Sequence, residues 1–336
     1  MGLEVIQRIK ALANLDASDS LVPQDGRFPF PISTSKTVEF RVTSLPVIRG
    51  EKLILKIVDP AVTQVPLDQL GYDKDQLEAL KAAIKRRRGL ILFAGPVGSG
   101  KTVCLYTALS QLDPDALNIS TVEDPVEVYI DGINQCAVNP ARGLDHASAL
   151  TSMLASDPEV VMVSELPDLA TARTAFKAAQ RGHLVLSAVE TNSAPETLTY
   201  LARLGIHSHY LATSISLIVA QRLVRRLCPE CRSPVELTRE QLVENGFPEA
   251  RCEESVQVFQ PAGCEQCDDG YRGRIGLFEV VPVQGPVAEV VLSGGDARTI
   301  ADACQQAGCR NLVQSGLARV FDGITSLDEV RRVTGR

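Results

Sequence analysis

The clearest candidate site in this sequence is a glycine-rich run between residues 95 and 102. An apolar run at 90–94 precedes it and a helical stretch at 103–112 follows, which is the strand-to-helix context that a phosphate-binding loop requires. The glycines allow backbone N–H groups to turn inward around phosphates. We expect Lys101 to reach the β- and γ-phosphates and Thr102 to hold Mg²⁺. The run fits GxxxxGK[ST] in full, and its predicted nucleotide-binding residues are Gly95, Pro96, Val97, Gly98, Ser99, Gly100, Lys101 and Thr102.

Carboxylates follow two further short apolar runs. Glu165 comes directly after the run 160–163 and one serine, where it can polarise an attacking water or hold a metal-bound water. A second acidic group after residues 119–122 consists of Glu123, Asp124 and Glu127, which can bind metal or orient water, and Glu123 joins Glu165 as a candidate catalytic residue. The carboxyl ends of parallel strands share one edge of a sheet, where ligands of α/β proteins bind. We therefore expect both groups beside the glycine-rich loop, with a solvated acidic loop as the alternative for each.

Two CxxC pairs predict a metal centre. The four cysteines are Cys228, Cys231, Cys264 and Cys267. Together they supply a tetrahedral thiolate set, the closed geometry of structural zinc. Unligated or oxidised thiols are the alternative. The other five cysteines show no ligand spacing and are interpreted as core or surface thiols: Cys104, Cys136, Cys252, Cys304 and Cys309.

The elements that must position these residues indicate an α/β protein. Short continuous apolar runs at 90–94, 119–122, 160–163 and 184–188 alternate with helical patterns, which is typical of a parallel sheet covered by helices. Before them, residues 3–15 predict a helix, and 27–32, 37–44 and 52–58 predict three strands. A further helix is expected at 73–88. After Cys228 we expect a loop-rich insert, and from Val287 mainly helix.

Composition limits the classes of partner. The net charge of −7 argues against a nucleic-acid or membrane surface as the main partner, although a local basic patch remains compatible with it. No apolar run approaches the roughly 20 residues of a membrane helix, and residues 1–15 lack the apolar stretch of a signal peptide. We therefore expect a cytoplasmic protein with reduced thiols. The basic run 85–88 is interpreted as a solvated helix C-terminus or, alternatively, as a partner or phosphate contact.

Several segments, taken together and in order, resemble the secretion-traffic ATPases that drive type II secretion and type IV pilus assembly. The resemblance covers residues 3–334, nearly the whole chain. Its segments are PQDGR at 23–27, GPVGSGKT at 95–102, TVEDPVE at 121–127, SDP at 156–158, GHLVLS at 182–187, QRLVRRLC at 221–228 and GYRGRIG at 270–276.

The resemblance implies a RecA-like core and a hexameric ring that binds ATP with Mg²⁺. It assigns Glu123, Asp124 and Glu127 to an acidic box and Glu165 to the end of the Walker B strand. It also implies that arginines of an N-terminal domain complete the site, for which Arg27 and Arg41 are the candidates. Ordinary surface arginines are the alternative. The four cysteines match assembly-type members, and retraction-type members lack them. An inner-membrane platform protein is the implied partner, with the ATPase at the inner face of the membrane and no nucleic acid bound.

The resemblance also implies a domain order. We expect a partial N-terminal α+β domain (1–58), a linker (59–66), a RecA-like core (67–227), a tetracysteine zinc insert (228–276) and a helical C-terminal region (277–336). The chain is expected to begin inside the N-terminal domain.

The departures from the family pattern lie among the residues expected to surround the nucleotide. Glu190 stands where the family has a histidine, and three arginines of the pattern are replaced by Leu21, Ala155 and Pro167. These changes remove positive charge near the expected γ-phosphate and add a negative one.

The main hypothesis is an ATP-hydrolysing motor for secretion or pilus assembly. The alternative is a slow or non-cycling nucleotide-binding paralogue that acts as an assembly or regulatory subunit. A DNA-moving conjugation-type ATPase is disfavoured by the acidic balance and the cysteine pairs.

Overall fold

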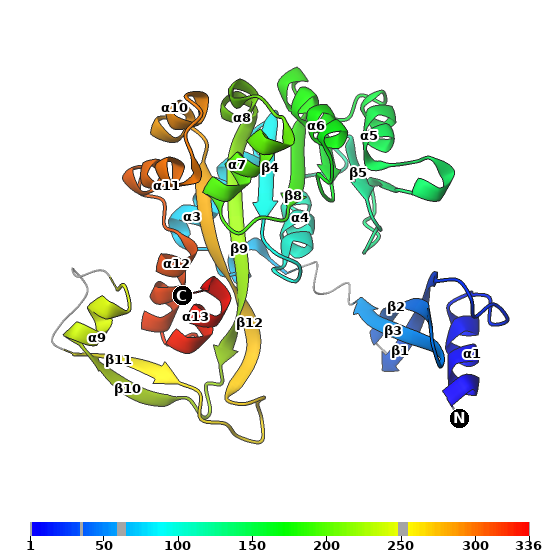
Figure 1. Ribbon diagram of the computed structural model, residues 1–336, viewed down its shortest axis with the longest axis horizontal. Coiled ribbons are helices and arrows are strands. Elements are labelled where there is room, and N and C mark those ends of the chain that lie inside the picture. Colours follow the sequence, from blue (N-terminus) through cyan, green and yellow to red (C-terminus); the bar gives the residue numbers. More distant parts are fainter. Residues whose placement is uncertain (1, 34–35, 59–64, 248–254, 336) are drawn as a thin grey trace. The chain divides into compact units, whose positions relative to one another are not determined.

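The computed structural model describes residues 2–33, 36–58, 65–247 and 255–335, and it divides into two compact units (Figure 1). The first unit comprises residues 1–64 together with 127–129. The second comprises residues 65–126 and 130–336. Of the expected linker at 59–66, residues 59–64 lie outside the described residues, and 65 and 66 belong to the second unit. Among the described helices, none combines the length and the apolar character needed to cross a membrane.

The first unit contains one helix and an antiparallel three-stranded sheet in the order β1-β2-β3. Its elements are α1 (Gly2–Leu12), β1 (Gln24–Ser33), β2 (Lys36–Val47) and β3 (Gly50–Val58). The predicted helix and all three predicted strands are present, although α1 ends at Leu12 instead of residue 15. The turn from β2 to β3 requires Gly50, whose φ of +114° lies in the region that favours glycine.

A buried ion pair lies within this small unit. The Lys10 ammonium is fully buried and donates to Glu51 at 2.7 Å and to the carbonyl of Asp19 at 2.6 Å. The Ser44 hydroxyl donates to the same Glu51 oxygen at 2.6 Å. A buried charge is tolerated only when it is paired and hydrogen-bonded, and this arrangement meets both conditions.

The second unit is built on a seven-stranded sheet with the order β12-β9-β4-β8-β7-β5-β6. All neighbouring strands are parallel except β12, which runs antiparallel to β9. The strands are β4 (Gly89–Ala94), β5 (Ile119–Glu123), β6 (Asn134–Ala137), β7 (Val160–Val163), β8 (Leu184–Val189), β9 (Ile215–Leu227) and β12 (Tyr271–Pro282). The predicted α/β fold with a mainly parallel sheet is confirmed.

Helices cover both faces of this sheet (Figure 1). One face packs against α3 (Lys74–Ile84) and α4 (Lys101–Leu109). The other face packs against α5 (His146–Leu154), α6 (Leu169–Arg181), α7 (Ala194–Leu204), α8 (Ser208–Ser214), α10 (Pro286–Leu292) and α11 (Ala297–Gln306). Every residue of β4 is buried, because it lies in the sheet interior with helices on both sides. Two single-turn 3-10 helices complete this part, at Leu67–Gln69 and Pro140–Arg142.

Two expected boundaries differ from the structure. The helix expected at 73–88 ends at Ile84, so Arg86, Arg87 and Arg88 lie beyond it in the connection to β4. The chain reverses there through Gly89, whose φ is +119°. The helical region expected from residue 277 starts inside β12, which continues to Pro282 because it pairs with β9 over most of its length.

The segment expected to be loop-rich contains regular structure. A hairpin of β10 (Ser233–Thr238) and β11 (Ser255–Gln260) frames the short helix α9 (Arg239–Glu244). Apolar side chains of this hairpin and α9 pack against α12 (Leu312–Phe321) and α13 (Leu327–Thr334). The sequence pattern missed these strands because they are short and largely amphipathic, with only one face in the core.

The C-terminal helix is attached to β9 by a charge cluster. The Glu329 carboxylate is fully buried and accepts from Arg225 at 2.9 and 3.1 Å and from Arg332 at 2.7 and 2.8 Å. The Arg225 guanidinium also lies 4.0 Å from the centre of the Tyr271 ring. Burial alone would raise the pKa of Glu329, but the two arginines outweigh it and hold the pKa at about 2.

We expect Glu329→Gln to destabilise the chain by about 1–3 kcal/mol, because hydrogen bonds to charged groups are lost from a buried position. A depressed folded-state pKa contributes stability that is present above the unfolded value of about 4.3 and is lost as pH falls toward 2. The difference in unfolding free energy between wild type and variant should therefore shrink below about pH 4. Urea titrations at pH 7 and pH 3, with Glu244→Gln as an exposed control, measure this. An equal difference at both pH values would contradict it.

Candidate functional site

The glycine-rich run forms the connection between β4 and α4, as the motif requires. Gly98 and Gly100 have φ of +77° and +92°, a backbone conformation that glycine adopts without strain. A side chain on Gly95 would meet the hydroxyl of Ser99 at 2.3 Å and the carbonyl of Gln221 at 2.8 Å. The loop can therefore take this tight shape only with glycine at these positions.

Lys101 lies at the start of α4 and turns back over the loop. Its Nζ donates to the carbonyls of Gly95 at 2.7 Å and Pro96 at 3.0 Å, and it lies 3.8 Å from Oε1 of Glu190. Burial lowers the pKa of Lys101, while the negative charges of Glu190 and Glu165 oppose that effect. The carboxylate at the altered family position thus directly faces the lysine that the motif assigns to phosphate.

The predicted carboxylates follow strands that end at the same edge of the sheet. Glu165 follows β7, is exposed, and is close enough to Lys101 to act on its charge. Asp124 follows β5, and its backbone N–H donates to the Ser164 hydroxyl at 3.3 Å. The structure therefore brings Glu165, Asp124 and Glu190 to the end of the sheet where β4 enters the loop.

Glu123 has a different environment from the other acids. It is buried at 2% exposure, and its carboxylate accepts from Thr121 at 2.5 Å and from Gln135 at 3.0 Å. The Tyr106 hydroxyl on α4 also donates to it. Both of its oxygens are thus held by the protein, an arrangement suited to fixing α4 and the end of β5. Tyr106 and Gln135 were not singled out from the sequence, because no motif marks them.

The remaining predicted residues lie in the first unit. Arg27 and Arg41 are directly opposite each other in the register of β1 and β2. Arg27 lies 3.8 Å from a Glu39 oxygen and Arg41 lies 3.7 Å from an Asp25 oxygen. Glu127 falls in the short segment grouped with this unit. The roles of these three residues at a nucleotide site stay predictions.

Two polar residues of β9 complete the surroundings of the loop. The Gln221 amide donates to the carbonyl of Ser99 at 3.0 Å, and Arg222 donates to the side chain and carbonyl of Asn192 at 2.9 and 3.1 Å. In the sequence these two residues stand out only as part of the segment 221–228 that resembles the family, and as two adjacent polar residues after an apolar run.

A cleft of about 710 Å³ opens beside the loop, lined by Pro96, Asn192, Arg222 and Glu279 among others. Glu279 lies on β12 and is 5% exposed, and its carboxylate accepts from the backbone N–H of Ala194 at 3.2 Å. Burial raises the pKa of Glu279 to about 7. The cleft therefore joins the phosphate loop to a buried acid whose charge changes near neutral pH.

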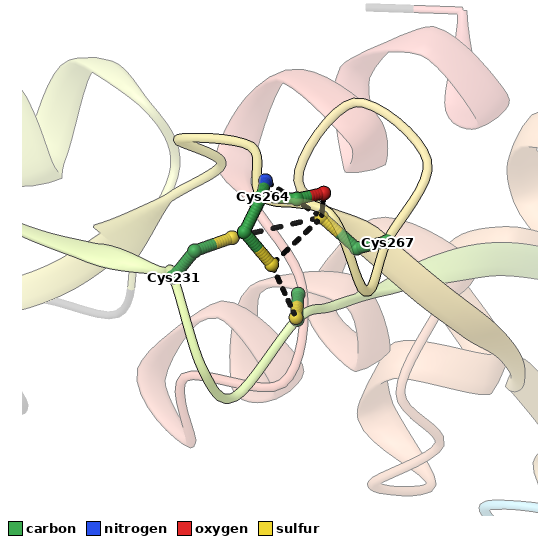
Figure 2. A group of neighbouring side chains, drawn as sticks. Cys231, Cys264 and Cys267 are labelled. Carbon is green, nitrogen blue, oxygen red and sulfur yellow. Dashed lines mark hydrogen bonds between the residues drawn. The ribbon is translucent and has the colours of Figure 1, made fainter.

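The four predicted zinc ligands converge. Their sulfur atoms all lie within 4.8 Å of one another, and Figure 2 shows Cys231, Cys264 and Cys267 turned toward a common centre. The distances between sulfur atoms are 3.9 Å for Cys228 and Cys264, 3.7 Å for Cys231 and Cys267, and 3.6 Å for Cys264 and Cys267. A tetrahedral centre with Zn–S bonds of about 2.3 Å separates sulfurs by about 3.8 Å. The donor set therefore fits Zn²⁺ in both chemistry and spacing.

Comparisons with known proteins identify the relatives of this chain. A sequence profile described as "Type II/IV secretion system protein" matches residues 1–332. The chain is 45% identical to the type IV pilus assembly ATPase PilB of Acinetobacter baylyi, covering 99% of this chain and 58% of that protein. PilB of Pseudomonas aeruginosa is 46% identical over 99% of this chain and 59% of its own length. The type II secretion system ATPase E of Vibrio cholerae is 38% identical over 98% of this chain and 65% of its own length. The chain thus spans less than two thirds of these relatives.

Solved structures show the same fold. The ATPase DotB of Legionella pneumophila superposes with a TM-score of 0.70 at 17% identity, covering 99% of this chain and 83% of that one. The pilus retraction motor PilT with bound ADP superposes with a TM-score of 0.68 at 19% identity, covering 98% and 80%.

We predict that the purified, reduced chain carries one equivalent of zinc, because four converging thiolates bind this ion tightly. Cys264→Ser should lose most of the metal and loosen the hairpin, whereas Cys136→Ser, outside the cluster, should retain it. Metal content by mass spectrometry and protease sensitivity of residues 228–276 measure both effects. Less than about a tenth of an equivalent in fresh wild type would refute the site.

Proposed function

Because this chain belongs to the type II/IV secretion system protein family, we propose that it is an ATP-binding, ATP-hydrolysing motor subunit that powers type II secretion or type IV pilus assembly. The observation that carries the proposal is the complete phosphate loop, with Lys101 inside it and Glu165 nearby. The curated relatives named as secretion and pilus assembly ATPases support the same assignment.

In this proposal each loop residue has one task. The backbone N–H groups of residues 95–102 bind the phosphates, Lys101 exchanges its two carbonyl contacts for phosphate oxygens, and Thr102 holds Mg²⁺. Glu165 orients the attacking water, and Asp124 and Glu127 contribute to the metal site. Glu123 positions α4 through Tyr106. Arg27 and Arg41 supply positive charge to the γ-phosphate, which stabilises charge as the bond breaks.

The proposed assembly follows from the family. We assign to this chain a hexameric ring at the cytoplasmic face of the inner membrane, recruited by a platform protein, with zinc bound at the cysteine cluster. Support for the metal comes from the sulfur spacing, and support for assembly over retraction comes from the relatives' names. No nucleic acid is assigned as a partner.

A second candidate is a paralogue that binds nucleotide and hydrolyses it slowly. The observation that favours it is the 3.8 Å approach of Glu190 to Lys101. Two like unit charges 4 Å apart, such as the Glu190 carboxylate and a phosphate oxygen, repel each other by about 4 kcal/mol at an effective dielectric of 20. The repulsion is smaller here because Glu190 is 58% exposed and water screens its charge. A phosphate drawn to Lys101 would meet the same carboxylate. Since 1.4 kcal/mol changes a rate about tenfold, even a reduced repulsion slows turnover.

Nucleotide binding should depend on Lys101. We expect Lys101→Ala to weaken binding of a fluorescent ATP analogue at least about tenfold in the presence of Mg²⁺, because the charge facing the phosphates is lost. Lys81→Ala, on the exposed side of α3, is the matched control and should bind normally. AMP should compete poorly, since the loop contacts the β- and γ-phosphates. Equal binding by wild type and Lys101→Ala would show that the site is misplaced.

Turnover should rise when the carboxylate is removed from the lysine. We expect Glu190→His, alone and with Pro167→Arg, to raise steady-state hydrolysis about tenfold or more with little change in ATP affinity. The reason is that a repelling charge is replaced by a neutral or positive group. The rate is measured on the assembled oligomer, with Glu244→His as an exposed control. A lower rate in Glu190→His would mean that Glu190 serves as a catalytic or metal-orienting acid.

A further inference from the structure

A basic groove runs along α6 at the amino edge of the sheet, opposite to the phosphate loop. We define this α6 groove as the surface formed by α6, α8 and residues 85–89. Its first hollow, about 810 Å³, is lined by Arg86, Arg87 and Arg88 together with Gln180 of α6. Its second hollow, about 480 Å³, shares Gln180 and adds Arg173 and Lys177. The two hollows are therefore adjacent, with Gln180 in the lining of both.

The segments of the chain that line this groove contain no acidic residues. The chain contains 41 aspartates and glutamates, yet residues 79–112, 169–189 and 197–229 contain none. These three segments supply every residue that lines the two hollows. In the part of the chain that the structure describes, no ion pair or side-chain hydrogen bond involves Arg86–Arg88, Arg173 or Lys177. The same edge of the sheet also carries Asp157 and Glu159, and the Glu159 carboxylate accepts from the backbone N–H of Asn118 at 2.7 Å.

The second hollow also has an apolar floor. Phe176 and Ile206 line it and are otherwise buried, at 3% and 4% exposure. Tyr210 of α8 lines the same hollow with 44% of its surface exposed, which gives the groove an aromatic contact with an apolar body and a polar tip. Cations above an apolar floor match a ligand that carries carboxylates on one side and apolar side chains on the other.

We propose that the α6 groove binds an acidic amphipathic peptide segment of a partner protein. Carboxylates of the peptide pair with the guanidinium groups of Arg86–Arg88, whose planar donors suit bidentate contacts. Apolar side chains of the peptide occupy the hollow between Phe176, Ile206 and Tyr210. A nucleic acid or an anionic lipid surface would leave this apolar hollow unfilled.

The groove and the phosphate loop lie at opposite ends of the same strand. β4 starts at Gly89, which lines the first hollow, and its last residue, Ala94, leads into Gly95 of the loop. A peptide in the groove therefore leaves the nucleotide site open, and both ligands can be bound at once.

The proposal is tested with the full 336-residue chain and a fluorescein-labelled helical peptide of about four turns, with leucine on one face and glutamate on the other. Fluorescence anisotropy should give a Kd below about 100 μM, and the peptide with glutamine in place of glutamate should bind at least about tenfold more weakly. The double variant Arg87→Glu and Lys177→Glu should show a similar loss. Arg298→Glu, an exposed arginine on α11, is the matched control. Retained ATP-analogue binding shows that the variant is folded.

Three results would overturn the proposal. One is a Kd of about 100 μM or weaker for the glutamate peptide. Another is equal binding of that peptide by the double variant and the wild type. The third comes from duplex DNA and phosphatidylglycerol vesicles as competing probes. If either binds more tightly than the peptide and its binding is lost in the double variant, the groove is a polyanion or membrane contact instead.

Discussion

The continuity of β9 is the constraint on which the rest of the second unit depends. This strand fixes the phosphate loop through Gln221, places Arg222 in the adjoining cleft, and pairs with β12 along its length. Farther along, Arg225 binds the buried Glu329 of α13, and the strand ends one residue before Cys228. A change in the register of β9 by one residue would exchange the faces of all these side chains at once.

The sequence allowed prediction of the residues whose chemistry depends on local spacing. The loop at 95–102 and the CxxC pairs are local patterns, and β4, β5, β7 and β8 are short, mainly apolar runs that are buried throughout, so motif and strand could be placed together. Arg222 and Glu279 could not be found in this way, because strand pairing across a long sequence separation brings them together. The strands β9 and β12 were not predicted, for a related reason. Arginines and glycines interrupt their apolar pattern, and only their mutual pairing extends the strands.

Charge is distributed unevenly between the two ends of the parallel sheet. The carboxyl edge carries Asp124, Glu165 and Glu190 around a single partly buried lysine. The amino edge carries the arginines before β4 and the cations of α6, in segments without acids. The net charge of −7 averages over these two edges and therefore describes neither of them. The prediction from composition that polyanions are disfavoured as main partners is compatible with a local basic surface of this kind.

The cysteine cluster also determines where this chain can vary in length. It joins residues 36 positions apart in the sequence, and the intervening hairpin and α9 rest on α12 and α13. The entropy of closing a loop grows only slowly with its length, so doubling the segment between the two CxxC pairs costs roughly 0.6 kcal/mol. With the proposed zinc bound, the cluster would close that segment at its base, and added residues there would leave the register of β9 undisturbed. Evolution, or an engineer who wishes to attach a reporter domain, can therefore insert sequence between the cysteine pairs while the end of the strand beside the glycine-rich loop stays in place.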